Sequence, residues 1–375
     1  MKNMRCWAEI DLAALERNIA RIRSALPKKM KYVSVVKADA YGHGIHPTAA
    51  RLMQSGVDLF AVANVKEAMD IREMGSGWPI LVLGPLLEEE DEALVNYDLI
   101  PTISNEEEIL RFSTLSRKTG KPIKVHLKVD TGMGRMGVWW EEAPRLLGQI
   151  LVAPELELEG ILTHFPDPAD EAFTQTQRER FLQVIQPALN QKNELLVHAD
   201  NSSSLISIEK DSPFNAVRIG LLQFGVAPQK GSLLADLRVE PVLSFHSRLA
   251  LVKNLPAGAS ISYGREHLLE KDTRIGVLAA GYGDAVPLAC GGRARGLIDG
   301  VAYPLIGRIT MDQTLIDLTD APAQLSAGAK VTLIGSQDCA SISLSDLAGH
   351  GNTIPWELLC SITKRVPRVY LTKRE

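Results

Sequence analysis

Short runs rich in β-branched residues alternate with helix-like stretches along the first two thirds of the chain, and this alternation restricts the fold most. It is typical of parallel strands joined by right-handed crossovers. Eight units in roughly 210 residues match a (β/α)8 TIM barrel in number and length. An open doubly wound sheet, which usually has fewer strands, is the alternative. The runs predicted as strands are YVSVVK (32–37), LFAVAN (59–64), ILVLG (80–84), LIPTIS (99–104), IKVHLKVD (123–130), LEGILTH (158–164), LLVHAD (195–200) and AVRIG (216–220).

The pattern changes after about residue 235, where β-rich, Gly-punctuated runs follow one another with few helical stretches between them. We therefore predict an α/β chain of two domains. A barrel covers 11–235, and an all-β domain covers 236–375 together with residues 1–10. One more helix is expected within 345–364.

Charge and cysteine usage exclude several classes of protein. The 375 residues contain 41 Lys and Arg and 45 Asp and Glu, a net charge of −4, which argues against binding to nucleic acid or to an anionic membrane. The N-terminus lacks the apolar segment of a signal peptide, and no apolar run is long enough to span a membrane, so we expect a cytoplasmic protein. The four cysteines lack zinc spacing, so we expect reduced thiols and no metal site.

Charged side chains stand at the carboxyl ends of several predicted strands, where a barrel carries its chemistry. They are Lys37, Lys128 with Asp130, His164, His198 and Arg218. A lysine inside a barrel mouth is costly unless it is paired, deprotonated or used covalently. Lys37 fits either covalent use or a pair with Asp39, and the spacing alone leaves both open.

Small polar residues follow the last two predicted strands, where barrels often bind phosphate. The chain reads Asn201-Ser202-Ser203-Ser204 after the seventh strand and Gly220-Leu221 after the eighth. Hydroxyl groups and free backbone N–H groups suit an oxyanion, although Asn201 or Ser202 could instead cap a helix. A lysine, a phosphate cradle and an arginine in one mouth suggest pyridoxal phosphate.

The segment Gly132-Met133-Gly134-Arg135-Met136-Gly137 matches the G-x-G-x-x-G pattern of dinucleotide-binding proteins. That fingerprint opens a βαβ unit and is followed by an acid at the end of the next strand. Here it follows the fifth strand, and Glu155 and Glu157 precede the sixth strand. We therefore do not assign a dinucleotide site.

The chain resembles the alanine racemase family of fold-type III pyridoxal-phosphate enzymes nearly from end to end. The family has an N-terminal barrel, a C-terminal β domain and a homodimer whose active sites combine both subunits. The segments that carry the resemblance are WAEIDLAALERNI (7–19), VVKADAYGHG (35–44), KVDTGMGRMG (128–137), GILTHF (160–165), HADNSS (198–203), VRIGL (217–221), ISYGREH (261–267), AAGYGDAVP (279–287), IGRITMDQ (306–313) and RVPR (365–368).

The resemblance implies racemisation of L- and D-alanine, which supplies D-alanine for bacterial peptidoglycan. Lys37 would bond to the cofactor and act as base on one face of Cα, and Tyr263 of the partner subunit would act on the other face. Racemisation without net redox needs two such bases.

The resemblance also assigns the surrounding residues. Arg218 would face the pyridine nitrogen, where a fixed cation weakens the electron sink, and His164 would orient it. Arg135 would contact the cofactor and the substrate carboxylate, which the backbone N–H of Met311 would also bind. Lys128 matches a lysine that is often carbamylated and that positions Arg135. Phosphate would be bound by Tyr41, Ser202, Gly220 and Leu221, and Tyr282 would line the approach to the site.

Two segments depart from the family pattern. Trp356 stands where the family has a phosphate-binding tyrosine, and Gly283 and Ala285 stand where alanine and glycine are commoner. These changes leave open a serine or broad-specificity racemase. A fold-type III decarboxylase would have an acid where Arg218 stands, and a non-catalytic pyridoxal-phosphate-binding protein would be a barrel alone.

Overall fold

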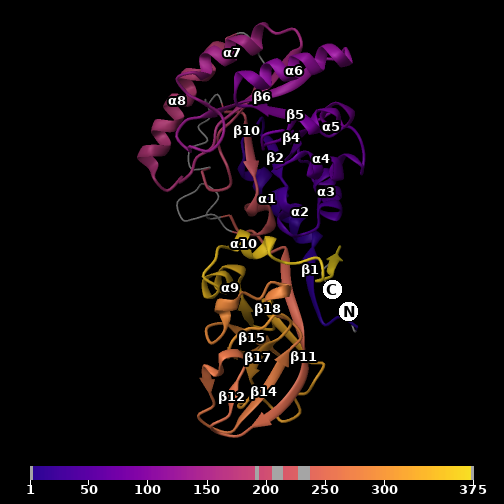
Figure 1. Cartoon of the computed structure of the whole chain (residues 1–375), viewed down its shortest axis with the longest axis vertical. Coiled ribbons are helices and arrows are strands. Elements are labelled where there is room, and N and C mark those ends of the chain that lie inside the picture. The colour runs from indigo at the N-terminus through magenta and orange to yellow at the C-terminus, as the bar shows by residue number, and fades with distance from the viewer. Residues whose placement is uncertain (1–2, 191–193, 205–213, 227–236, 373–375) are drawn as a thin grey trace. The chain divides into compact units, whose positions relative to one another are not determined.

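The chain forms two compact units (Figure 1). The computed structural model describes residues 3–190, 194–204, 214–226 and 237–372. The barrel unit comprises Glu16–Ala40 and Ile45–Val239, and the β unit comprises Met1–Leu15, Tyr41–Gly44 and Glu240–Glu375. The predicted domain boundary between residues 235 and 236 lies outside the described residues.

The barrel unit contains all eight predicted strands in one parallel sheet, ordered β10-β2-β3-β4-β5-β6-β8-β9. The two ends of this order meet at an isolated parallel bridge between Asn201 and Arg218, which confirms a near-closed barrel and excludes the open sheet. The strands are β2 (Lys31–Val35), β3 (Leu59–Val62), β4 (Ile80–Val82), β5 (Ile100–Ile103), β6 (Ile123–Asp130), β8 (Leu156–Leu162), β9 (Leu196–His198) and β10 (Ala216–Ile219), with β7 (Val138–Trp139) pairing to β6.

Helices follow these strands and lie around the outside of the sheet (Figure 1). Two of them begin with the same device: the Asn64 side chain accepts the N–H of Glu67, and the Asn105 side chain accepts that of Glu108. Such caps satisfy N–H groups that a helix start leaves unpaired. The helices are α1 (Leu12–Ala25), α3 (Ile45–Gln54), α4 (Val65–Arg72), α5 (Asp91–Asn96), α6 (Glu106–Thr119), α7 (Ala143–Val152) and α8 (Glu171–Leu189).

The β unit is built on a sheet ordered β19-β18-β15-β16-β17-β14-β11-β1-β20, as the β-rich sequence predicts. Strand β18 pairs with both β15 and β11, so six strands close into a ring, and β11 is the long orange strand of Figure 1. The strands are β1 (Cys6–Asp11), β11 (Leu243–Leu255), β14 (Thr273–Leu278), β15 (Arg295–Ile298), β16 (Val301–Ile306), β17 (Thr314–Asp317), β18 (Lys330–Gln337), β19 (Ala340–Ile342) and β20 (Arg368–Leu371).

Two short helices occupy the region where one was expected, α9 (Leu344–His350) and α10 (Pro355–Cys360). A separate two-stranded sheet is formed by β12 (Ser260–Ile261) and β13 (His267–Leu268). None of the helices within the described ranges combines the length and the hydropathy that a membrane crossing requires.

Candidate active site

Lys37 begins a left-handed turn that follows the first barrel strand. Strand β2 ends at Val35, two residues earlier than predicted, and the backbone of residues 38–41 then adopts φ angles of 53° to 56°. Each non-glycine residue in this region costs on the order of 1 kcal/mol or more, and such strain persists where surrounding contacts fix it. The sequence carries no glycine in this turn that would signal the conformation.

Backbone hydrogen bonds hold this turn in place. The N–H of Ala38 donates to Glu67 Oε1 at 2.7 Å. The Asp39 carboxylate accepts the N–H of Ile45 at 2.7 Å, so this acid supports the start of α3. The half-buried Lys37 is thereby held at the carboxyl end of β2.

The guanidinium of Arg218, on β10, is caged by carbonyl oxygens and imidazoles. Its Nη1 donates to the carbonyl oxygen of His198 at 2.7 Å, and its Nη2 donates to those of Thr163 at 2.7 Å and Ala199 at 3.0 Å. It lies 3.0 Å from Nδ1 of His198 and 3.2 Å from Nδ1 of His164. Burial lowers the pKa of Arg218 to about 10, so it remains a cation at neutral pH.

The arginine fixes the proton positions of a chain of buried histidines. Because a guanidinium only donates, Nδ1 of His198 accepts and its Nε2 carries the hydrogen. That hydrogen points at Nδ1 of His126 at 2.9 Å, and Nε2 of His126 lies 3.8 Å from the Glu159 carboxylate. Burial and the charge of Arg218 hold the pKa of His198 well below its usual range and lower that of His164 to about 2. Both histidines are therefore neutral.

The G-x-G-x-x-G segment forms a loop around Asp130. One carboxylate oxygen accepts the N–H groups of Gly132 at 2.9 Å, Met133 at 2.9 Å and Gly134 at 3.2 Å. These are the groups that a dinucleotide site would offer to phosphate, so the structure agrees that this is not such a site. A Cβ at Gly137 would lie 2.9 Å from the carbonyl oxygen of Lys128, and glycine lets the loop return against β6.

Lys128 is buried on β6 among positive charges. Burial, together with the charges of Arg218, Arg135 and Lys37, lowers its pKa to about 7. A large share of this amine is therefore uncharged near neutral pH. Four cationic side chains thus converge at the strand ends, which suits an anionic cofactor and a substrate carboxylate.

The proposed phosphate residues of the barrel unit meet where the sheet order closes. The N–H of Gly220 donates to Ser202 Oγ at 3.1 Å, and Leu221 begins the short 3-10 helix η3 (Leu221–Phe224). Asn201 Oδ1 accepts the N–H of Ser203 at 2.9 Å, so it stabilises its own turn. Residues 205–213, which would follow such a cap, lie outside the described residues.

The remaining predicted site residues, Tyr41, Tyr263, Tyr282 and Met311, belong to the β unit. Tyr263 is 70% exposed, Tyr282 46% and Met311 53%. Ala285, just after the Tyr282 turn, has a φ of 91°, a conformation that favours the glycine commoner in the family.

Sequence reasoning missed two groups. The chain from His198 through His126 to Glu159 was not predicted, because these residues come from three strands and show no common spacing. Arg365 and its bonds to Asp284 were also missed, although both lie in segments that resemble the family.

Comparison with known proteins matches the whole described architecture. The family models "Alanine racemase, N-terminal domain" and "Alanine racemase, C-terminal domain" match residues 10–228 and 242–370. The chain is 38% identical to an alanine racemase of Halothermothrix orenii over 98% of this chain and 97% of that protein. It is 38% identical to alanine racemase 1 of Bacillus subtilis over 97% and 92% of the two chains.

Solved structures give the same result. A Bacillus anthracis alanine racemase with bound L-Ala-P superimposes with a TM-score of 0.88 at 33% identity, covering 98% of this chain and 95% of that one. A Bartonella henselae alanine racemase with covalently bound pyridoxal phosphate superimposes with a TM-score of 0.87 at 26% identity, covering 98% and 100%.

We expect the folded chain to lose stability as pH falls below about 6.5, the ordinary pKa of histidine. The buried histidines are neutral in the folded chain. Between pH 6.5 and about pH 2, the folded pKa of His164, the unfolded chain therefore binds more protons than the folded chain. Each histidine contributes a slope of up to about 1.4 kcal/mol per pH unit. Urea unfolding at a series of pH values measures this slope. His164→Asn should reduce it and His350→Gln, on α9, should not; an unchanged slope in His164→Asn would contradict the assignment.

Proposed function

Since the chain belongs to the alanine racemase family, we propose that it interconverts L- and D-alanine with pyridoxal phosphate and so supplies D-alanine for peptidoglycan. The observation that carries the proposal is the caged guanidinium of Arg218 beside Lys37 and Lys128. A permanent cation does not give a proton to the cofactor ring, so the electron sink is weaker and side reactions such as transamination are suppressed. A fold-type III decarboxylase would have an acid where Arg218 stands. His164 and His198 hold that guanidinium in place.

The residues of the site fit the cofactor. Lys37 would bond to it, Arg218 would face its ring nitrogen, and phosphate would be held by Tyr41, Ser202, Gly220 and Leu221. Two observations support these roles: the N–H of Gly220 donates to Ser202 Oγ, and positive charge is in excess at the strand ends. When bound, pyridoxal phosphate supplies an electron sink that weakens the Cα–H bond of the amino acid.

Two groups on opposite faces of Cα would move the proton. The Lys37 amine takes or returns it on one face, and the hydroxyl of Tyr263 of the partner subunit serves the other. Arg135 and the backbone N–H of Met311 hold the carboxylate, which keeps Cα between the two groups. Tyr282 lines the approach to the site.

We propose a homodimer with shared sites. The exposure of Tyr263, Tyr282 and Met311 supports it, because all three side chains are accessible to a partner subunit. The family match breaks between residues 228 and 242, which supports domains of 11–235 and of 236–375 with 1–10. The reaction, which needs only a cofactor and a free amino acid, fits a cytoplasmic enzyme.

Purified protein with pyridoxal phosphate should produce D-alanine from L-alanine, detected by chiral chromatography. L-serine and L-lysine, incubated separately, define the specificity, because the departures at Gly283, Ala285 and Trp356 lie in segments that the family uses around the site. If D-serine forms from L-serine and no D-alanine forms from L-alanine, the substrate is serine and not alanine. No D-enantiomer from any of the three, with cofactor bound, would sink the proposal.

Mixing two inactive variants tests the two bases and the shared site together. Lys37→Ala should abolish racemisation and the visible cofactor band, and Tyr263→Phe should keep the band and lose most activity. Random re-association of the two proteins places both intact residues in about a quarter of the sites, so about a quarter of the wild-type activity should return. If each site lay within one chain, mixing would restore no activity. Sedimentation of the active protein as a monomer would also contradict the shared site.

We also propose that Lys128 is carbamylated. Its neutral amine attacks the carbon of CO2, an N–C bond forms, and the nitrogen releases a proton to solvent, which leaves a carbamate anion among Arg135, Arg218 and Lys37. With 13C-labelled bicarbonate, NMR should show a protein-bound carbonyl signal. Lys128→Ala should remove the signal and Lys124→Ala, an exposed lysine on the same strand, should keep it. A signal that survives in Lys128→Ala would refute the assignment.

A further inference from the structure

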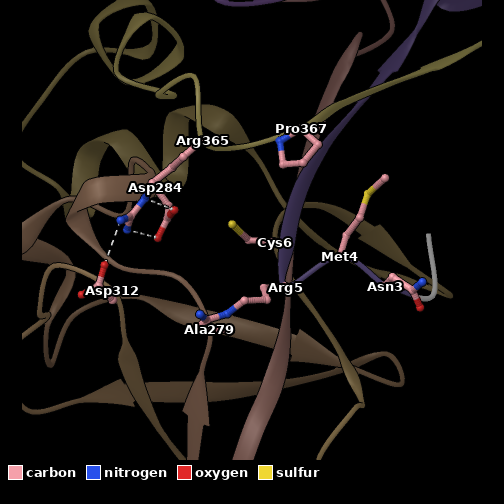
Figure 2. Close-up of a pocket in the computed structure, with 9 residues that line it drawn as sticks. All are labelled: Asn3, Met4, Arg5, Cys6, Ala279, Asp284, Asp312, Arg365 and Pro367. Atoms are coloured by element: carbon pink, nitrogen blue, oxygen red, sulfur yellow. Dashed lines mark hydrogen bonds and ion pairs between the residues drawn. The ribbon is translucent and has the colours of Figure 1, made fainter.

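Arg365 joins two turns of the β unit that carry proposed substrate-site residues (Figure 2). Its Nε and Nη2 donate to the two carboxylate oxygens of Asp284 at 2.6 Å and 2.8 Å. Its Nη1 donates to Asp312 Oδ1 at 2.8 Å, and Nη2 also donates to the carbonyl oxygen of Met311 at 3.0 Å. One planar group therefore binds both the turn that follows Tyr282 and the turn that contains Met311.

The same two turns are also joined through their backbones. The N–H of Tyr282 donates to the carbonyl oxygen of Thr310 at 3.0 Å, and the N–H of Gly283 donates to that of Met311 at 2.9 Å. The Thr310 carbonyl and the Met311 N–H belong to one planar trans peptide, so they point in opposite directions. The bond to Tyr282 therefore turns the N–H of Met311 away from this turn.

The position of the guanidinium is set by Asp284, which is buried although Arg365 is partly exposed. Side-chain exposure is 6% for Asp284, 44% for Arg365 and 60% for Asp312, so the bond to Asp312 is screened by water and the paired bonds to Asp284 are much less so. Asp284 Oδ2 also accepts the N–H of Gly281 at 2.9 Å. Its carboxylate and burial raise the pKa of the Cys6 thiol to about 12, so the thiol stays neutral beside it.

Gly283 gives the guanidinium room. A Cβ there would lie 2.6 Å from Arg365 Nη2 and 3.0 Å from the Met311 carbonyl oxygen. This chain has glycine where alanine is commoner in the family, and the guanidinium packs directly on the backbone of the turn.

We propose that Arg365 is a positioning residue that holds the N–H of Met311 in the orientation that binds the substrate carboxylate. This inference rests on the proposed function. Arg365 does not touch the substrate; it fixes the 310–313 turn against the Tyr282 turn. Because the carboxylate is common to both enantiomers, the residue sets the affinity for L- and D-alanine alike.

The test compares steady-state racemisation by the holoenzyme, by Arg365→Ala and by Arg365→Lys in both directions. Loss of one hydrogen bond to a charged group predicts that Arg365→Ala raises KM for both enantiomers between about tenfold and a hundredfold. The kcat should change by less than about fivefold, and the visible cofactor band should be unchanged. Arg365→Lys keeps the charge but not the planar fork of the guanidinium, so its KM should lie between those of the wild-type enzyme and of Arg365→Ala.

Arg274→Ala is the matched control. Arg274 lies in the same unit and donates to the carbonyl oxygens of Ala321, Pro322 and Ala323, none of which belongs to either turn. This control should lower the unfolding midpoint and leave KM unchanged.

Added methylguanidinium provides a second readout. A cavity of about 300 Å³ borders Arg365, Asp284, Asp312 and Cys6, so the small cation can reach the carboxylates that Arg365→Ala leaves unpaired (Figure 2). At concentrations far below those that unfold proteins, it should lower the KM of Arg365→Ala, and sodium chloride of equal ionic strength should not.

Three outcomes would overturn the inference. They are an unchanged KM in a folded Arg365→Ala, an effect confined to kcat or to one enantiomer, and an equal rise of KM in Arg274→Ala. If Arg365→Ala does not fold, the test uses Arg365→Lys and Asp312→Asn. Each of these variants should raise KM modestly for L-alanine and for D-alanine. Wild-type KM values in the two variants would refute the role of Arg365. Failure of the wild-type enzyme to racemise alanine counts against the proposed function and is seen before any variant is compared.

Discussion

A buried cation at the closing edge of the barrel organises the polar groups around it. Arg218 replaces water with three carbonyl oxygens and two imidazoles, and these charge-assisted bonds offset the cost of its desolvation. Burial and the charge of Arg218 together keep His164 and His198 neutral and lower the pKa of Lys128. Neutral imidazoles and a partly uncharged Lys128 therefore surround this cation.

The two units contribute to this chemistry by different physical means. In the barrel unit, strand ends bring Lys37, Lys128 and Arg218 together, and a strained turn at 38–41 re-aims the chain directly after the lysine. In the β unit, side chains are presented by exposed turns, and one planar guanidinium fixes those turns to each other. Under the proposed function, the strand ends would hold the cofactor and the hydrogen-bonded turns would hold the substrate carboxylate.

Local patterns in the sequence predicted the helices and strands well. They did not predict contacts between segments that lie far apart in the chain. Alternating runs located every barrel strand, and the ends of those strands located the charged residues. The left-handed turn at 38–41 was missed because Ala, Asp and Tyr carry no signal for positive φ. Arg365 was missed because its partners lie 81 and 53 residues away and share no periodicity with it. Pairing of β18 with both β15 and β11 escaped the sequence for the same reason.

The barrel closes at the junction between β9 and β10, the first and last strands of the sheet order. Across it, the N–H of Asn215 donates to the carbonyl oxygen of Val197 at 3.0 Å, the N–H of Arg218 donates to that of Asp200 at 3.0 Å, and the N–H of Gly220 donates to Ser202 Oγ at 3.1 Å. An anion bound between Ser202 and Gly220 would add a further link between the segments that follow the two strands. Under the proposed function, binding of the cofactor phosphate and closure of the ring would be thermodynamically linked, so the cofactor would stabilise the barrel as well as take part in the reaction.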